Sequence, residues 1–176
     1  MRLFLAVCFS EPFRQELDEI AAALAAQALR ARRTLPENYH LTLVFLGEQQ
    51  DAPPIAALMD EILGQAFTLS SAGLGCFRRA GGDIYWLGLK REPKLLALQA
   101  ALAAGLKARG YRLENRGFQP HLTLLRQAAL PPDFNLADFA AGLPALEERA
   151  QAISLMLSTR EQGRLVYREL HRRSLI

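Results

Sequence analysis

Apolar and polar residues follow two different periods along the chain, and these periods predict a mixture of helices and strands. From Pro12 to about Arg30, apolar residues recur every three or four positions, which is typical of an amphipathic helix. Proline also introduces helical patterns at 53–63 and 95–107, and a shorter helix is expected from about Leu136. Apolar runs bounded by turn residues predict strands at 3–9, 40–46, 67–77, 84–89, 121–125, 152–158 and 165–170.

This pattern contains a duplication. The tetrapeptide His-Leu-Thr-Leu begins at His40 and again at His121, 81 residues later, and the dipeptide Glu-Pro recurs from position 11 to position 92 with the same spacing. A shared offset for two separate motifs indicates an internal repeat, with halves of approximately 1–80 and 81–176. We therefore predict a single bilobal α+β domain over residues 1–176. In it, a pseudo-twofold duplication of a β-α-β-α-β unit places antiparallel sheets around a central cleft and helices outside.

The two tetrapeptides each present a histidine and a threonine on one face of a strand. Side chains alternate across a strand, so His40 and Thr42 point to one side while the intervening leucines point to the other. The same holds for His121 and Thr123 in the second copy. If the pseudo-twofold symmetry brings the two strands together, two imidazoles and two hydroxyls face one cleft.

Paired histidines beside hydroxyls suit acid–base chemistry on an anion. One imidazole can act as general base and the other as general acid, because histidine titrates near neutral pH. Threonine hydroxyls can donate hydrogen bonds to the non-bridging oxygens of a phosphate ester. A metal site is the competing interpretation, although zinc usually needs three or four protein ligands and no patterned cysteine or carboxylate accompanies the histidines. A second alternative is that each tetrapeptide is an ordinary amphipathic strand retained for packing. Identical polar positions in an otherwise diverged repeat favour chemistry.

Composition bears on the charge of the ligand and on the cellular compartment, and it leaves the predicted fold and site unchanged. The chain has 176 residues and a formal net charge of +3, which is compatible with an anionic ligand but does not require one. The apolar start of the chain is interpreted as a strand and not a signal peptide, and no apolar run is long enough to cross a bilayer. Cys8 and Cys76 lie in apolar, strand-like runs, which favours reduced thiols and a cytoplasmic protein without membrane association. We expect a monomer.

At this point the sequence resembles a known family, the two-histidine (2H) phosphoesterase superfamily. Two His-x-Thr-x motifs about eighty residues apart are its signature, and the bacterial and archaeal RNA 2′,3′-cyclic phosphodiesterases, also called 2′-5′ RNA ligases, are the more similar branch. The resemblance covers nearly the whole chain, through the segments RLFLAV, PENYHLTLVFLG, WLGL and FQPHLTLLR and the closing residues Ser158, Gly163, Tyr167 and Leu170.

The resemblance implies a groove between two lobes and no metal or nucleotide cofactor. It implies that His40 is the proton donor and His121 the proton acceptor, with Thr42 and Thr123 contacting the phosphate. Water activated by His121 would open an RNA 2′,3′-cyclic phosphate to a 2′-phosphomonoester, and the reverse reaction would be ATP-independent 2′-5′ ligation. RNA ends with a cyclic phosphate, tRNA fragments among them, are the expected partners. A small cyclic nucleotide or ADP-ribose cyclic phosphate as substrate, and a non-catalytic RNA-end-binding module, are the alternatives.

Several other residues bear on an RNA site. Arg126 follows the second motif where the first copy has Phe45, and a guanidinium at the cleft mouth is well matched to phosphate oxygens, although it can also simply cap the strand in solvent. Thr34 stands where many relatives in the family have a tryptophan, which weakens the case for base stacking there. The remaining candidates are interpreted mainly as core aromatics or solvated surface residues: Tyr39, Phe118, Trp86, Arg78, Arg79, Arg116 and His171.

Overall fold

The computed structural model describes residues 1–115 and 117–176. The helices are α1 (Glu11–Ala26), α2 (Pro53–Glu61), α3 (Pro93–Ala108) and α4 (Leu136–Ala141), with a 3-10 turn η1 at Pro36–Asn38. The strands are β1 (Arg2–Cys8), β2 (Arg30–Arg33), β3 (His40–Glu48), β4 (Phe67–Phe77), β5 (Asp83–Leu89), β6 (His121–Ala129), β7 (Glu147–Ala150), β8 (Ala152–Glu161) and β9 (Arg164–Ser174).

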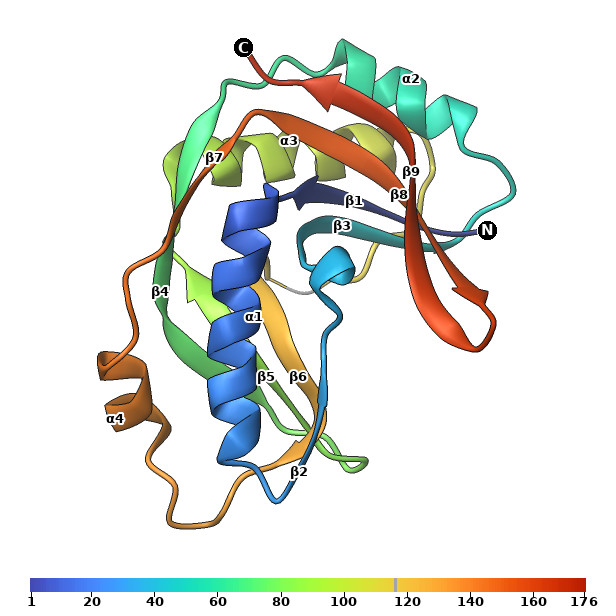
Figure 1. Ribbon diagram of the computed structural model, residues 1–176. Coiled ribbons are helices and arrows are strands. Elements are labelled where there is room, and N and C mark those ends of the chain that lie inside the picture. The colour runs from blue at the N-terminus through green and yellow to red at the C-terminus, as the bar shows by residue number, and fades with distance from the viewer. Residues whose placement is uncertain (116) are drawn as a thin grey trace.

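Within the described part of the chain, the strands form two antiparallel sheets (Figure 1). One has the order β3-β1-β8-β9 and the other the order β2-β6-β5-β4-β7. The neighbouring strands β3 and β1 of the first sheet correspond to β6 and β5 of the second, so each His-Leu-Thr-Leu strand pairs with the strand that begins its own repeat. The predicted α+β class with antiparallel sheets is confirmed.

The two sequence halves exchange strands. β4 belongs to the first half but pairs with β5 and β7 in the five-stranded sheet, whereas β8 and β9 return from the second half to pair beside β1. The helices also cross over, since α1 contacts β2 and β6 and α3 contacts β3. Neither half of the sequence therefore contains a complete sheet with its own covering helix.

The repeated Glu-Pro dipeptides begin the two long helices. The hydroxyl of Ser10 caps α1 by accepting a hydrogen bond from the backbone of Phe13, and the Glu92 carboxylate caps α3 in the same way. Proline follows in the first turn of both helices, where its missing N–H is not needed. The apolar stripes of both helices contribute to one buried core, together with the inward leucines of β3 and β6.

The structure corrects several boundaries and adds two strands. The first helix ends at Ala26 and not near Arg30, because Arg30–Arg33 pairs with β6 as β2. This strand escaped prediction because all four of its residues are exposed and lack an alternating pattern. β7 is similarly polar and pairs with β4. The strand predicted at 121–125 continues to Ala129, and the strand predicted at 165–170 continues to Ser174. No helix among the described residues is long and apolar enough to span a membrane.

Candidate active site

A cleft of about 1250 Å³ is lined by residues of both sheets. Its walls come from β1, β3 and the β8–β9 hairpin on one side and from β2, β6 and the start of β5 on the other. His40 and Thr42 enter it from β3, and His121, Thr123 and Arg126 enter it from β6. The leucines between them are buried in the core, as strand alternation predicts. The structure thus brings all five predicted site residues into one cleft.

Both histidine rings are oriented by backbone carbonyls at equivalent positions of the repeat. Nδ1 of His40 lies 2.7 Å from the carbonyl oxygen of Asn38, and Nδ1 of His121 lies 2.7 Å from that of Gln119. A carbonyl oxygen only accepts hydrogen bonds, so in both rings Nδ1 carries the proton and donates it. In the neutral imidazoles, Nε2 is consequently the free acceptor. For His40 this nitrogen lies 2.9 Å from Oγ1 of Thr42, whose hydroxyl donates to it.

Each histidine ring also contacts a pair of aromatic rings. The centroid of His40 lies 4.8 Å from that of Phe4 and 5.0 Å from that of Tyr167. The centroid of His121 lies 5.1 Å from that of Phe77 and 5.7 Å from that of Trp86. Both T-shaped contacts, with Tyr167 and Phe77, place a ring edge against a ring face, the arrangement that aromatic quadrupoles favour. The aromatic pairs restrict the tilt of both imidazoles.

Trp86 owes its place beside His121 to two glycines. It is the cross-strand partner of Gly75, where an added Cβ would lie 2.2 Å from the indole ring. Gly88, two residues along the same strand, leaves similar room, since its Cβ would lie 3.3 Å from the indole. Because these glycines have no side chains, the indole packs directly over their backbone. Trp86 therefore lies beside His121, on the face of the five-stranded sheet that also carries Thr123, next to the residues that line the cleft.

The electrostatic environment keeps both histidines neutral. The pKa of His40 is lowered to about 4, mainly by burial; the hydrogen bond with the Asn38 carbonyl opposes part of this shift, and the positive charge of Arg126 adds a smaller lowering. The pKa of His121 is also lowered, first by burial and then by Arg126. With lowered pKa values, both imidazoles are neutral at neutral pH, with the proton on Nδ1 and none on Nε2.

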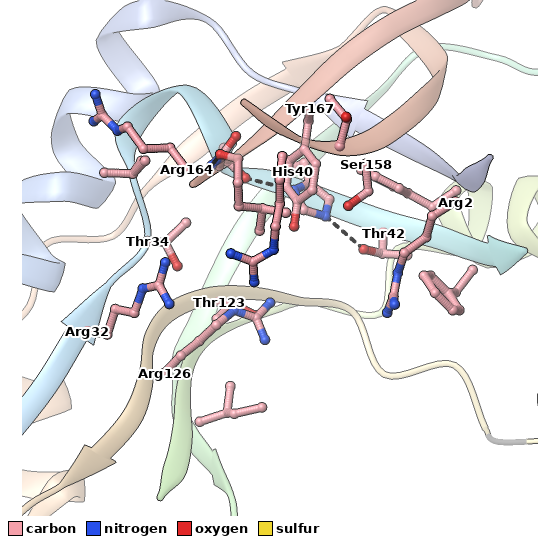
Figure 2. Close-up of a pocket in the computed structure, with 18 of the residues that line it drawn as sticks. Arg2, Arg32, Thr34, His40, Thr42, Thr123, Arg126, Ser158, Arg164 and Tyr167 are labelled. Carbon is pink, nitrogen blue, oxygen red and sulfur yellow. Dashed lines mark hydrogen bonds between the residues drawn. The ribbon is translucent and has the colours of Figure 1, made fainter. Parts of the chain in front are cut away.

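Positive charge is concentrated in the cleft although the chain as a whole carries only +3. In the described part of the lining, seven arginines face a single carboxylate, Glu48. Figure 2 shows Arg126 and Thr123 reaching into the cleft from one side, opposite His40, Thr42 and Tyr167. The arginines of the lining are Arg2, Arg32, Arg33, Arg79, Arg126, Arg160 and Arg164. Such a lining attracts a polyanion.

The other candidates named from the sequence are dispersed. Tyr39 is buried and its hydroxyl bonds to Asp18 at 3.4 Å, which excludes it as an exposed stacking platform. Arg79 lines the cleft, whereas Arg78 pairs with Asp83. Phe118 packs against the core, His171 pairs with Asp60 of α2, and Arg116 lies outside the described residues.

Sequence reasoning missed several residues that line the cleft. Arg2 of β1 and Arg164 of β9 both line the cleft, because β1, β8 and β9 pair in one sheet. Tyr167 belongs to the closing sequence pattern, and its position beside His40 depends on the same strand pairing. The anchoring carbonyls were detectable in principle, because Asn38 and Gln119 are separated by the same 81 residues as the histidines. Among the described residues, no three His, Cys, Asp or Glu side chains are grouped as metal ligands.

Comparisons with known proteins agree on one family. The model of the 2′-5′ RNA ligase superfamily matches residues 9–162. Proteins named RNA 2′,3′-cyclic phosphodiesterase are 32% identical in Archaeoglobus fulgidus, over 76% of both chains, and 32% identical in Escherichia coli, over 76% of this chain and 79% of the relative. A crystal structure of Escherichia coli LigT complexed with 3′-AMP superposes with a TM-score of 0.81 and 27% identity, covering 99% of this chain and 97% of that one.

Proposed function

Because the chain belongs to the 2′-5′ RNA ligase superfamily, we propose that it is an RNA 2′,3′-cyclic phosphodiesterase that opens cyclic phosphate ends to 2′-phosphomonoesters. The observation that carries this proposal is the pair of histidines at equivalent positions of the repeat, each with Nε2 available in one arginine-lined cleft. A cleft of about 1250 Å³ exceeds the 300–1,000 Å³ typical of small-ligand pockets, which favours an RNA end over a small cyclic nucleotide.

In the hydrolytic direction His121 acts as the general base and His40 as the general acid. Nε2 of His121 takes a proton from water, whose oxygen forms a bond to phosphorus. The bond from phosphorus to the 3′ oxygen breaks, and that oxygen takes the proton from Nε2 of His40. The products are a 2′-phosphomonoester and a 3′-hydroxyl. General acid and general base assistance typically contribute about 10²–10⁴-fold each.

The proton on His40 is acquired together with the substrate. In the free protein the pKa of His40 is about 4, because the ring is buried and faces the charge of Arg126. A bound phosphate neutralises that guanidinium and adds a negative charge beside Nε2, and both changes raise the pKa. Substrate binding thus converts a neutral imidazole into the acid that the reaction needs.

Protonation of His40 also frees the hydroxyl of Thr42. While Nε2 is neutral it accepts a hydrogen bond from Oγ1, at 2.9 Å. Once Nε2 carries a proton it no longer accepts, so the hydroxyl turns to donate to a non-bridging phosphate oxygen. Thr123 and Arg126 supply further donors from β6. These groups hold the ester in line for attack and stabilise its developing charge.

The same geometry supports ligation when an RNA 5′-hydroxyl is the nucleophile. An RNA 5′-hydroxyl takes the place of water, so that its oxygen attacks the cyclic phosphate while His121 removes its proton. The 3′ oxygen again leaves with the proton from His40, and a 2′-5′ phosphodiester results. No ATP is consumed, because the strained cyclic ester is itself the activated group.

The direct test uses an oligonucleotide ending in a 2′,3′-cyclic phosphate, with the product followed by ³¹P NMR in the presence of EDTA. We expect turnover to a 2′-phosphomonoester that EDTA leaves unchanged and that His40→Ala and His121→Ala each abolish. His171→Ala is the matched control, because this third histidine pairs with Asp60 outside the cleft. Absence of turnover by the wild-type protein, or full activity of both cleft variants, would overturn the proposal.

We further propose that the enzyme works as a cytoplasmic monomer on RNA ends such as tRNA fragments. Both histidines come from one chain, so no second copy is needed to complete the site. The two cysteines are free, as thiols are in a reducing compartment. Light scattering coupled to size-exclusion chromatography of the active protein tests the monomeric state, and a dimeric mass at assay concentrations would refute it.

A further inference from the structure

Two arginines lie directly opposite each other on the strands that border one end of the cleft. Arg32 of β2 is the cross-strand partner of Arg126 of β6, and both side chains line the cleft. Directly opposed residues in antiparallel strands have Cβ atoms about 4.5–5.5 Å apart, and like charges at this position are destabilising. A protein retains such a pair at a cost in stability, which an anion bound between the guanidiniums would offset.

The neighbouring Arg33 differs from Arg32 because it has a carboxylate partner. Arg33 also lines the cleft, but its charge is paired with the carboxylate of Asp18 of α1. Arg32 has no carboxylate partner in the described structure, and Arg126 also has none there. The pair is therefore left with its positive charge directed into the cleft, as Figure 2 shows for both side chains.

A polar but non-aromatic residue completes this end of the cleft. Thr34 lies two residues beyond Arg32, so the two side chains share a face, and the backbone N–H of Thr34 continues the pairing with β6 by bonding to Leu124. Its Oγ1 has no hydrogen-bond partner among the described residues. Guanidiniums and a hydroxyl are donors for phosphate oxygens, and no aromatic plane is offered here for a base.

We propose that Arg32, together with Arg126, forms a second phosphate subsite that binds the phosphodiester one nucleotide upstream of the cyclic phosphate. This inference rests on the proposed function and names its substrate class: an RNA end of at least two nucleotides, recognised through its backbone and without regard to base. Arg126 lies between the two phosphates, and Arg32 contacts only the upstream one. A cyclic mononucleotide lacks that phosphate and cannot use the subsite.

The test compares a cyclic mononucleotide with a dinucleotide that ends in a 2′,3′-cyclic phosphate, in wild type, Arg32→Gln and Arg30→Gln. Arg30 is the matched control, because it lies on the same strand and loses the same charge but does not line the cleft. A charge-assisted hydrogen bond contributes about 1.5–3 kcal/mol, so Arg32→Gln should lower kcat/KM for the dinucleotide by about 10–150-fold. The same variant should keep kcat/KM for the mononucleotide within about twofold of the wild-type value. Arg30→Gln should keep kcat/KM for both substrates within the same range.

Two further readouts separate a ligand contact from a structural role. The slope of log KM against log salt concentration for the dinucleotide should fall by about 0.7 in Arg32→Gln, as expected for one lost phosphate contact on a single strand. Its Tm should equal or exceed that of wild type, since the substitution relieves repulsion with Arg126. Equal loss on both substrates, no loss on the dinucleotide, or a lowered Tm that accounts for the loss would overturn the subsite. Absence of wild-type turnover on either substrate would instead overturn the proposed function.

Discussion

The low pKa of His40 makes a quantitative prediction about stability as a function of pH. In the folded protein burial holds this pKa at about 4, whereas an unfolded chain gives histidine about 6.5. Above pH 6.5 the side chain is neutral in both states and has no effect. As the pH falls from 6.5 towards 4, the unfolded chain binds a proton that the folded protein does not, so the free energy of unfolding decreases. Below pH 4 both states are protonated and the loss is complete.

The size of this effect follows from the two pKa values. Their difference of about 2.5 units corresponds to about 3 kcal/mol in total, of which about 2 kcal/mol is lost between pH 7 and pH 4.5. The perturbation that isolates it is His40→Gln, which removes the titrating group and leaves an amide of similar reach. Titration of the aspartates and glutamates is common to both proteins and cancels in the difference.

The assay is urea denaturation of wild type and His40→Gln at pH 7 and at pH 4.5. We expect the free energy of unfolding of the variant to decrease by about 2 kcal/mol less than that of wild type over this interval. His121→Gln should change the pH dependence in the same direction, because the pKa of His121 is also lowered by burial. Parallel curves for wild type and His40→Gln would refute the reasoning that burial keeps this imidazole neutral.

Further predictions concern the same centre. Gly75→Ala should destabilise the protein by about 1–3 kcal/mol and lower kcat, because the new methyl overlaps the indole of Trp86 that supports His121. Gly117→Ala is the control, because an added Cβ at Gly117 meets open space. Urea denaturation followed by the fluorescence of the single tryptophan measures the stability of both variants. Arg126→Gln should raise the pKa of His40 in the free protein, since a repelling charge is removed, and should raise KM; an NMR titration showing an unchanged or lower pKa would contradict this.

The sequence was sufficient to predict the centre of the site because that centre is encoded locally. Strand alternation and a constant offset place His40, Thr42 and their counterparts on cleft-facing positions without knowledge of the fold. The surrounding arginines could not be assigned in this way. Arg2 and Arg164 reach the cleft lining through the pairing of β1, β8 and β9, and β2 has no hydrophobic period because all four of its residues are exposed.

The exchange of strands between the two halves also bears on how the protein folds. β1 pairs with β8, and the partners Ala6 and Ser154 are more than 140 residues apart in the sequence. Folding dominated by such distant pairings is slow, because the entropy of closing a long loop is lost before the contacts compensate for it. A nascent chain therefore has no cleft until the ribosome has released its last strands. Fragments divided near residue 80 should be unfolded separately and regain activity only when mixed, as complementing halves of one cooperative unit.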